Sequence, residues 1–155
     1  METKALFPGS FDPFTKGHAD IVRRALAVFD KVVIGIGVNE NKKTMFTPAE
    51  RLKMIRDLYR DVPGVDVYVY EGLTVDFAGE VNATCILRSL RSVKDYEYEL
   101  SIADVNKKLS GLDTFLLFTN PRLAYVSSSV VRELIHFGKD VTAFLPEGLS
   151  LIKKN

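Results

Sequence analysis

Short apolar runs alternate along the chain with segments in which apolar residues recur every three or four positions. The runs predict strands at 5–7, 32–38, 65–70, 85–87 and 114–118. The helical periodicity predicts helices at 18–29, 47–60, 74–78, 95–109 and 127–138. Strands that alternate with helices indicate a parallel sheet with right-handed crossovers. We therefore expect a single α/β domain over residues 1–155, with a Rossmann-like open sheet of five parallel strands and helices on both faces.

Several helix boundaries carry local signals. Residues 47–50, Thr-Pro-Ala-Glu, have the pattern of a capping box with proline at the first helical position. Thr74 is expected to cap the short third helix, and Ser127 or Ser128 is expected to cap the last one. The weaker pattern near the end of the chain predicts a short helix after Pro146.

The composition narrows the class of protein. A formal net charge of +1 gives no overall electrostatic footprint for nucleic acid. The single cysteine, Cys85, excludes an intrachain disulfide and is expected to be a buried thiol, and two histidines are too few for a histidine-rich metal site. No apolar segment reaches the roughly 20 residues of a membrane span, and Pro8 and Asp12 interrupt any signal-peptide pattern. We expect a cytoplasmic protein that binds neither nucleic acid nor membrane.

The segment from Pro8 to His18 follows the first strand and precedes the first helix. Its turn residues, among them Gly9 and Gly17, would hold the backbone close to a ligand. A helix N-terminus attracts a phosphate group, and a histidine in the first helical turn can donate a hydrogen bond to it. The segment therefore predicts a nucleotide phosphate at the tip of the first strand. The plainer alternative is a turn with a helix-capping histidine.

Cations and hydroxyls follow other strands of the predicted sheet. Arg88, Arg91 and Lys94 come after the fourth strand, Lys42 and Lys43 after the second, and three serines at 127–129 begin the last helix. In a parallel sheet these positions fall at the same edge as His18, where ligands bind. Guanidinium groups and helix N-termini both suit phosphate oxygens. The alternatives are solvated basic loops and an ordinary helix cap.

Other motifs are excluded or assigned no role. The Gly-rich segment 35–40 has Glu40 in place of the third glycine and lies inside an apolar run, so it is not a dinucleotide-binding turn. The chain has no P-loop motif, and His136 is expected to have no catalytic role. No general base or nucleophile stands out. A phosphate acceptor is already an anion and needs no base, so a cleft of fixed cations suits attack by one phosphate on another.

Together these residues resemble the nucleotidylyltransferase superfamily and, within it, the bacterial phosphopantetheine adenylyltransferase family. The resemblance covers about residues 4–145. It is carried by the segments 8–18, 41–43, 45–47, 50–51, 88–91, 95–99, 127–129, 132, 140–141 and 144–146. The resemblance implies reversible transfer of AMP from ATP to 4′-phosphopantetheine, which gives dephospho-coenzyme A and pyrophosphate in the penultimate step of coenzyme A synthesis. It also implies Mg²⁺ as cofactor, a homohexamer and feedback inhibition by coenzyme A.

The same resemblance assigns roles to individual residues. The expected catalytic residues are His18, which would donate to the α-phosphate of ATP, Lys42 and Arg91. The residues expected to bind phosphopantetheine are Ser10, Lys42, Thr74 and Arg88. The residues expected to bind ATP are Ser10, Phe11, His18, Ser89, Leu90, Arg91, Glu99, Leu123, Ala124, Tyr125, Val126, Ser127, Ser128 and Ser129. No metal-ligating residue of the protein is expected.

The sequence departs from the usual family pattern at a few positions. Ser10 stands where threonine is common, Ser89 where glycine is common, and Pro121-Arg122 precedes the serines in an unusual stretch. None of these changes removes a charged group that the implied mechanism needs.

Two other functions stay open at this point. One is a related nucleotidylyltransferase that acts on another phosphorylated acceptor, such as nicotinamide mononucleotide; such relatives often have a histidine at the position of Thr15. The other is a non-catalytic sensor of nucleotides or coenzyme A on the same fold. A sensor has no need for the combination of His18, Lys42 and Arg91.

Overall fold

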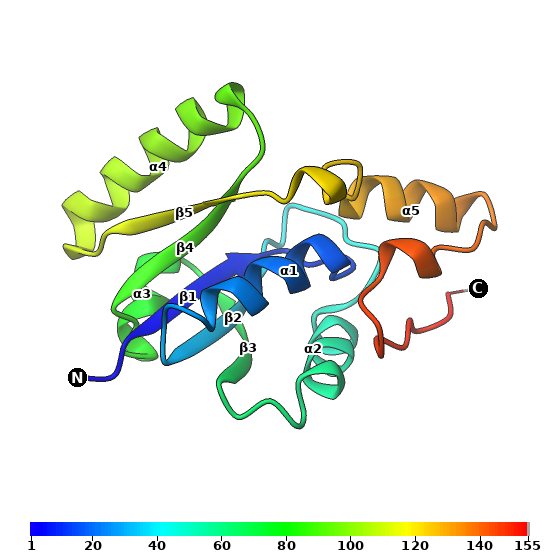
Figure 1. Cartoon of the computed structure of the whole chain (residues 1–155), viewed down its shortest axis with the longest axis horizontal. Coiled ribbons are helices and arrows are strands. Elements are labelled where there is room, and N and C mark those ends of the chain that lie inside the picture. The colour runs from blue at the N-terminus through cyan, green and yellow to red at the C-terminus, as the bar shows by residue number, and fades with distance from the viewer. Residues whose placement is uncertain (155) are drawn as a thin grey trace.

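A sheet of five parallel strands in the order β3-β2-β1-β4-β5 forms the centre of the structure (Figure 1), a computed structural model that describes residues 1–154. The strands are β1 (Lys4–Gly9), β2 (Lys31–Val38), β3 (Val65–Glu71), β4 (Cys85–Leu90) and β5 (Thr114–Phe118). The helices are α1 (Lys16–Ala25), α2 (Pro48–Leu58), α3 (Thr74–Glu80), α4 (Val93–Ser110) and α5 (Ser128–His136), with 3₁₀ turns at Pro121–Leu123 and Thr142–Phe144. The predicted fold class and order of elements are confirmed.

Two predicted boundaries are wrong in ways that affect the site. α1 begins at Lys16, two residues before His18, because Thr15 caps it. β4 continues to Leu90, beyond the predicted end at 87, so Arg88 and Ser89 lie in the strand and not after it. Polar side chains end an apolar run in the sequence, but here they occupy strand positions that face cavities.

Three other local predictions can be compared with the structure. The capping box at Thr47 is confirmed, since Thr47 and Glu50 bond each other's backbone N–H groups. Thr74 is not a cap: Leu73 precedes the helix, and the Thr74 hydroxyl instead bonds Tyr70 Oη at 2.8 Å. The helix predicted after Pro146 is also wrong, since within the described residues that position is followed by a single turn, closed by the Leu149 N–H bond to the Pro146 carbonyl.

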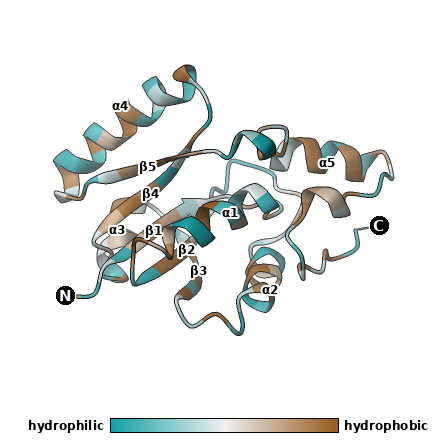
Figure 2. Ribbon diagram, viewed as in Figure 1, coloured by the Kyte–Doolittle hydropathy of each residue, from teal (hydrophilic) through white to brown (hydrophobic). Residues whose placement is uncertain are grey.

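The sheet packs against helices on both faces. Phe7 of β1 and Ile34 of β2 belong to a buried cluster with Ile21 of α1. Leu6, next to Phe7 in β1, points the opposite way and packs with Phe77 of α3. Figure 2 shows the apolar strands between these helices. Cys85 is buried in β4, as predicted, and its burial raises the pKa of the thiol to about 11.

The chain reverses its direction across the sheet between β1 and β4. From β1 it proceeds through β2 to β3, and it then crosses back to β4 and β5 on the other side of β1. Such a reversal leaves a crevice beyond the carboxyl ends of the strands, where ligands of open α/β sheets bind. Within residues 1–154, no helix is both long enough and apolar enough to cross a membrane.

Candidate functional site

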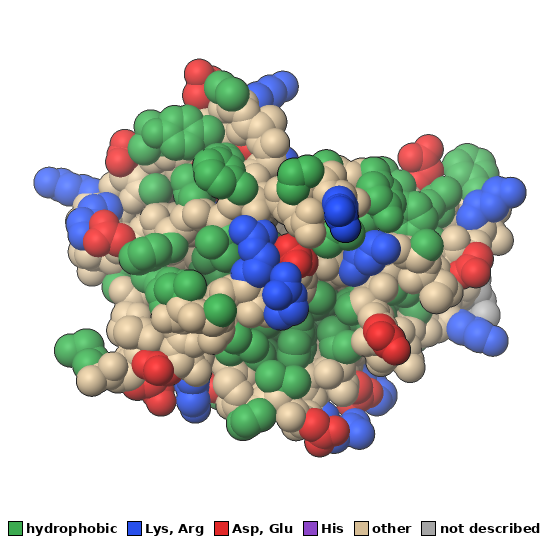
Figure 3. All heavy atoms as spheres, in the orientation of Figure 1, with side chains coloured by type: hydrophobic (Ala, Val, Ile, Leu, Met, Phe, Trp, Pro, Cys, Tyr) green, Lys and Arg blue, Asp and Glu red, His purple; other side chains and the backbone are tan. Residues whose placement is uncertain are grey.

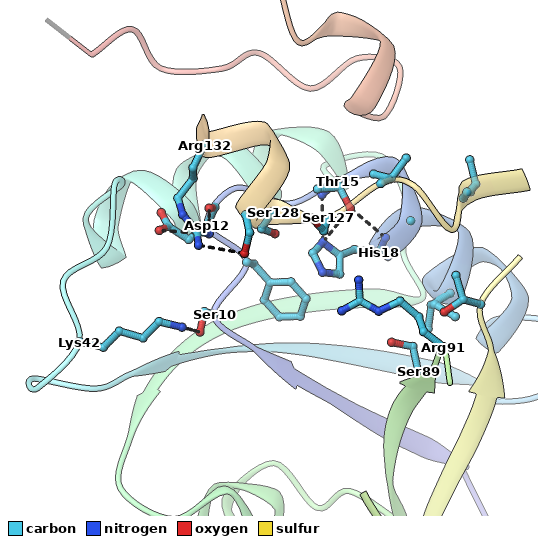
Figure 4. Close-up of a pocket in the computed structure, with 17 residues that line it drawn as sticks. Ser10, Asp12, Thr15, His18, Lys42, Ser89, Arg91, Ser127, Ser128 and Arg132 are labelled. Carbon is cyan, nitrogen blue, oxygen red and sulfur yellow. Dashed lines mark hydrogen bonds and ion pairs between the residues drawn. The ribbon is translucent and has the colours of Figure 1, made fainter. Parts of the chain in front are cut away.

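A cavity of about 240 Å³ opens beyond the ends of β1 and β4, at the reversal of the sheet (Figure 4). It is lined by Ser10, Phe11, Asp12, Thr15, Gly17, His18, Ile21, Lys42, Ser89, Arg91, Thr119, Leu123, Val126, Ser127, Ser128, Ser129 and Arg132. The three predicted catalytic residues, His18, Lys42 and Arg91, therefore share one cavity. Two helix N-termini, those of α1 and α5, also reach it through His18 and the serines.

His18 is the third residue of α1 and takes part in its cap. The backbone N–H of Thr15 donates to Nδ1 of His18 at 3.0 Å, and the Thr15 hydroxyl lies 3.2 Å from the same nitrogen. Because Nδ1 accepts an N–H, it carries no proton, and the neutral ring must carry its proton on Nε2. The capping alternative raised by the sequence is thus correct for one ring nitrogen. The other nitrogen remains available as a donor to a ligand.

Three phenylalanines surround the imidazole of His18. The ring centroids of Phe7, Phe11 and Phe14 lie 6.3, 5.0 and 5.2 Å from its centroid. Burial and, to a smaller extent, the positive charge of Arg91 lower the pKa of His18 from 6.5 to about 4. The imidazole is therefore neutral at physiological pH, with a fixed orientation.

Gly9 makes room for one of these rings. Phe11 has a positive φ of 50°, and its ring folds back over the end of β1. A Cβ atom at Gly9 would lie 2.9 Å from Cζ of Phe11, closer than real contacts allow. Glycine is required at this position because Phe11 must pack there to contact His18.

Cationic side chains enter the cavity from three elements. Lys42, in the loop after β2, lies with Nζ 3.5 Å from Oγ of Ser10. Arg91, just after β4, makes only a long contact of 3.9 Å with Asp95 and has a half-exposed side chain. Arg132 of α5 donates to the carbonyl of Asp12 at 2.8 Å. In Figure 4, Lys42 approaches Ser10 at one end of the cavity, and Arg91 extends toward His18 at the other.

A different set of basic residues lies outside the cavity. Figure 3 shows Lys and Arg side chains around an acidic group over α1, where Arg23 and Arg24 pair with Asp20 at 2.9 and 3.3 Å. These two arginines share one carboxylate, so each of them is paired with a negative charge. The cations that line the cavity are less fully paired and therefore better suited to bind an anion.

Not all predicted site residues meet in this cavity. Leu90, Glu99, Ala124 and Tyr125 do not line it. Glu99 is buried and forms a two-bond pair with Arg88, with its oxygens 2.9 and 2.8 Å from Nε and Nη2. The expectation that Glu99 accompanies Arg91 is therefore not met by this arrangement. The carboxylate raises the pKa of Arg88 and holds its guanidinium in place.

Arg88 and Glu99 line a second hollow of about 200 Å³ together with Thr74, Tyr98 and Asn106. Arg88 also donates to the carbonyl of Pro8 at 3.2 Å, so this hollow adjoins the end of β1. The predicted phosphopantetheine residues are thus divided. Ser10 and Lys42 line the first cavity, and the remaining two line the second.

Sequence reasoning assigned no site role to several residues that line the first cavity. They are Thr15, Ile21, Thr119 and Arg132, whereas Asp12 and Gly17 were expected there only as turn residues. Arg132 had a usable signal, because it lies one helical turn after the serine at 129 and so shares its face of α5. Thr119 had none, since it lies in an unmarked loop after β5.

Comparisons with known proteins identify the family of the chain. The family model described as cytidylyltransferase-like matches residues 6–134. The phosphopantetheine adenylyltransferase of Phocaeicola vulgatus is 56% identical over 148 residues, which cover 96% of this chain and 98% of the relative. The enzyme of the same name from a Nocardioides species is 48% identical and covers 93% and 91%. The chain belongs to the cytidylyltransferase-like family and, within it, to the phosphopantetheine adenylyltransferases.

A solved structure supports the fold alone. A bifunctional NMN adenylyltransferase/ADP ribose pyrophosphatase from Francisella tularensis superposes with a TM-score of 0.70 at 18% identity. The superposition covers 94% of this chain and 45% of that one. At this identity the similarity does not extend to the acceptor, and the adenylyltransferase assignment depends on the curated relatives.

Proposed function

We propose that the protein transfers AMP from ATP to 4′-phosphopantetheine, giving dephospho-coenzyme A and pyrophosphate. The observation that carries the proposal is the joint placement of His18, Lys42 and Arg91 around one cavity that also receives two helix N-termini. Curated relatives named phosphopantetheine adenylyltransferase, 56% and 54% identical, support the choice of acceptor.

The acceptor phosphate is the nucleophile in this reaction. Ser10 and Lys42 bind it, since hydroxyl and ammonium lie side by side and offer adjacent donors. Lys42 also offsets the repulsion between two phosphate anions as they approach each other. The oxygen of the acceptor phosphate attacks the α-phosphorus in line, a new P–O bond forms, and pyrophosphate leaves with the electrons of the broken bond.

His18 stabilises the charge that develops on the α-phosphate. Its neutral imidazole donates through Nε2–H, because Nδ1 is occupied by the Thr15 N–H. The phenylalanine cage fixes the ring before the substrate arrives, so little reorganisation is needed during the reaction. The donor keeps its proton throughout, and no general base is required.

Arg91 and the start of α5 bind the outer phosphates of ATP. Ser127 caps α5, so the free N–H groups of its first turn lie at the cavity. The segment from Leu123 to Ser129 provides the adenine side of the site. The second hollow, with Arg88 and Thr74, accepts the polar pantetheine arm. Glu99 acts there by orienting Arg88, and its proposed contact with ATP would require that pair to open.

We assign Mg²⁺ to the bound nucleotide and not to a preset protein cage. Among residues 1–154, no group of three or more His, Cys, Asp or Glu side chains lies close enough to hold a metal ion. Of the described residues that line the cavity, Asp12 supplies the carboxylate, and its oxygens accept the N–H groups of Met45 and Phe46. Mg²⁺ typically binds through substrate phosphates and keeps several waters. Equilibrium dialysis should therefore detect tight Mg²⁺ binding only in the presence of ATP.

The proposal also includes assembly of the protein into a homohexamer and feedback inhibition by coenzyme A. Apolar side chains are exposed along α4 and the edge strand β5, among them Val93, Leu109 and Phe118 (Figure 3). A large exposed apolar surface of this kind suits contact between subunits. Sedimentation velocity should give an assembly larger than a dimer, and Phe118→Asp should reduce it. The substrates ATP and phosphopantetheine place the reaction in the cytoplasm.

The experiment that tests the proposed reaction is an acceptor panel. Pyrophosphate release from ATP is measured with phosphopantetheine, with nicotinamide mononucleotide, and with pantetheine, which lacks the nucleophilic phosphate. Release with phosphopantetheine and not with pantetheine is expected. Release with nicotinamide mononucleotide alone would indicate the related transferase, and no release with any acceptor would favour the sensor.

A further inference from the structure

The segment from Pro8 to Pro13, at the end of β1 and in the turn after it, is held by side chains of three other elements. Its carbonyl groups accept hydrogen bonds from Arg88 at Pro8 (3.2 Å), Arg51 at Ser10 (2.7 Å), Arg132 at Asp12 (2.8 Å) and Ser128 at Pro13 (2.8 Å). Carbonyl oxygens carry partial negative charge and would repel a phosphate if they faced it. Their bonds to these donors offset that partial charge and fix the turn.

Arg51 differs from the other donors because it is almost fully enclosed. Its side chain, on the first turn of α2, is only 2% exposed, and it does not line the cavity. Nη1 donates to the carbonyl of Ser10 at 2.7 Å, and Nε donates to the carbonyl of Phe46 at 3.1 Å. One guanidinium thus joins the turn after β1 to the loop that precedes α2.

Asp12 joins the same two segments, but here the turn after β1 supplies the acceptor and the loop before α2 supplies the donors. Its two carboxylate oxygens accept the backbone N–H groups of Met45 and Phe46 at 2.9 and 2.8 Å. The carboxylate is buried. Burial lowers the pKa of Arg51, and the charge of Asp12 opposes part of that shift. The two segments are therefore tied by four hydrogen bonds that involve a buried cation and a buried anion.

The two tied segments carry Ser10 and Lys42, whose Oγ and Nζ lie 3.5 Å apart. Lys42 itself is exposed and lies outside helix and strand, where its backbone N–H donates to the carbonyl of Asn39 at 3.0 Å. That bond fixes the local turn but not the distance of the turn from Ser10. We propose that Arg51, together with Asp12, is a positioning residue for the acceptor phosphate: it sets the distance between Ser10 and Lys42. This inference rests on the proposed function for the identity of the ligand.

A role in stability alone would not need an arginine here. Apolar residues of similar volume often replace buried ion pairs without loss of stability. A lysine keeps the charge but has no planar fork, so it cannot donate to both carbonyls in the same geometry. Arg51→Lys therefore separates the charge of the group from its ability to join the two segments.

Arg56 provides a matched control on the same helix. Its guanidinium donates through Nε and Nη2 to the carbonyl of Val67 at 3.1 and 2.9 Å, but it lies away from the cavity. Arg56→Lys thus removes an equivalent fork from α2 and leaves the link between Ser10 and Phe46 intact.

Steady-state kinetics of the full-length protein with both substrates test the proposal. Arg51→Lys should lower kcat/KM for phosphopantetheine roughly 10- to 100-fold, as expected for a displacement of about 1 Å, with the KM for ATP within about twofold. Arg56→Lys should leave both within about twofold. In a Lys42→Ala background, Arg51→Lys should cause less than about a threefold further loss, since the group that it positions is absent. An equal loss in both backgrounds, or equal effects of the two Arg→Lys changes, would overturn the proposal.

A second measurement needs no substrate. Hydrogen exchange of the Met45 and Phe46 amides should accelerate at least about tenfold in Arg51→Lys and in Asp12→Asn, with α3 unaffected. Unchanged exchange in both variants would refute the link. If Arg51→Lys does not fold, Asp12→Asn takes its place in the kinetic comparison. A wild type that releases no pyrophosphate would refute the proposed function, and the exchange result would still decide whether the link exists.

Discussion

The backbone N–H of Thr15 donates to Nδ1 of His18 at 3.0 Å, and this contact decides which ring nitrogen can face a ligand. In the proposed reaction, one side chain is thus both a helix cap and the catalytic donor. The bond fixes the tautomer, and the phenylalanine cage fixes the ring plane. Together they orient one neutral N–H donor at the end of β1 before any substrate binds.

Replacement of His18 by alanine should mainly affect the chemical step. Loss of one preorganised donor typically lowers kcat by roughly 10² to 10³. Since the charge on the α-phosphate is greatest in the transition state, the KM for ATP should change little. Steady-state kinetics with both substrates measure the split between the two constants. A normal kcat with a raised KM would instead make His18 a residue of ground-state binding.

The same environment makes His18 a source of pH dependence in stability. The pKa of its imidazole is about 4 in the folded protein, against 6.5 in the unfolded chain. Between these values the unfolded chain binds more protons, so protonation favours unfolding and the free energy of unfolding falls as the pH drops from about 6.5 to 4. Urea unfolding across this range should show a shallower decline in His18→Asn than in the wild type. Parallel curves for the two proteins would contradict the lowered pKa.

Lys42→Ala should impair the acceptor more than the nucleotide. Nζ of Lys42 lies beside Ser10, at the opposite end of the cavity from Arg91. Calorimetry should show weaker phosphopantetheine binding and nearly unchanged ATP binding. Lys43→Ala, in the same exposed loop but not lining the cavity, is the control. Equal losses for both ligands would show that Lys42 is misplaced in the proposed mechanism.

The strands and their order in the sequence were predictable because short apolar runs alternate with segments of helical periodicity. The end of β4 was not, because Arg88 and Ser89 are polar residues at strand positions that line cavities. A strand that borders a ligand site loses the pattern by which strands are recognised. Arg88 and Ser89 could therefore be predicted as site residues, but their position inside β4 could not.

The partner of Arg88 was also beyond prediction. Glu99 lies eleven positions later on α4, and whether it meets Arg88 or Arg91 depends on how α4 packs against β4. Nothing in the spacing of residues determines that packing. The cap of α1 was difficult for another reason: the common capping-box pattern has Glu or Gln at the position that His18 occupies.

Gly9→Ala should disturb the site through Phe11. The added Cβ would lie 2.9 Å from Cζ of Phe11, whose ring contacts the imidazole of His18. We expect a loss of stability of about 1–3 kcal/mol, as for other overpacked positions, together with a fall in kcat. Gly79→Ala is the matched control, because no heavy atom lies within 4 Å of the Cβ built there. Alanine should stabilise α3 at that position by about 0.5 kcal/mol.

Thermal unfolding measures the stability of Gly9→Ala and Gly79→Ala, and steady-state kinetics measures their kcat. The lost kcat of Gly9→Ala should be accompanied by a raised pKa of the His18 imidazole, measured by NMR, because a displaced Phe11 admits water to the ring. An unchanged imidazole pKa with reduced kcat would mean that Gly9 acts on the phosphate directly and not through Phe11. The cage and the catalytic donor would then be independent features of the turn.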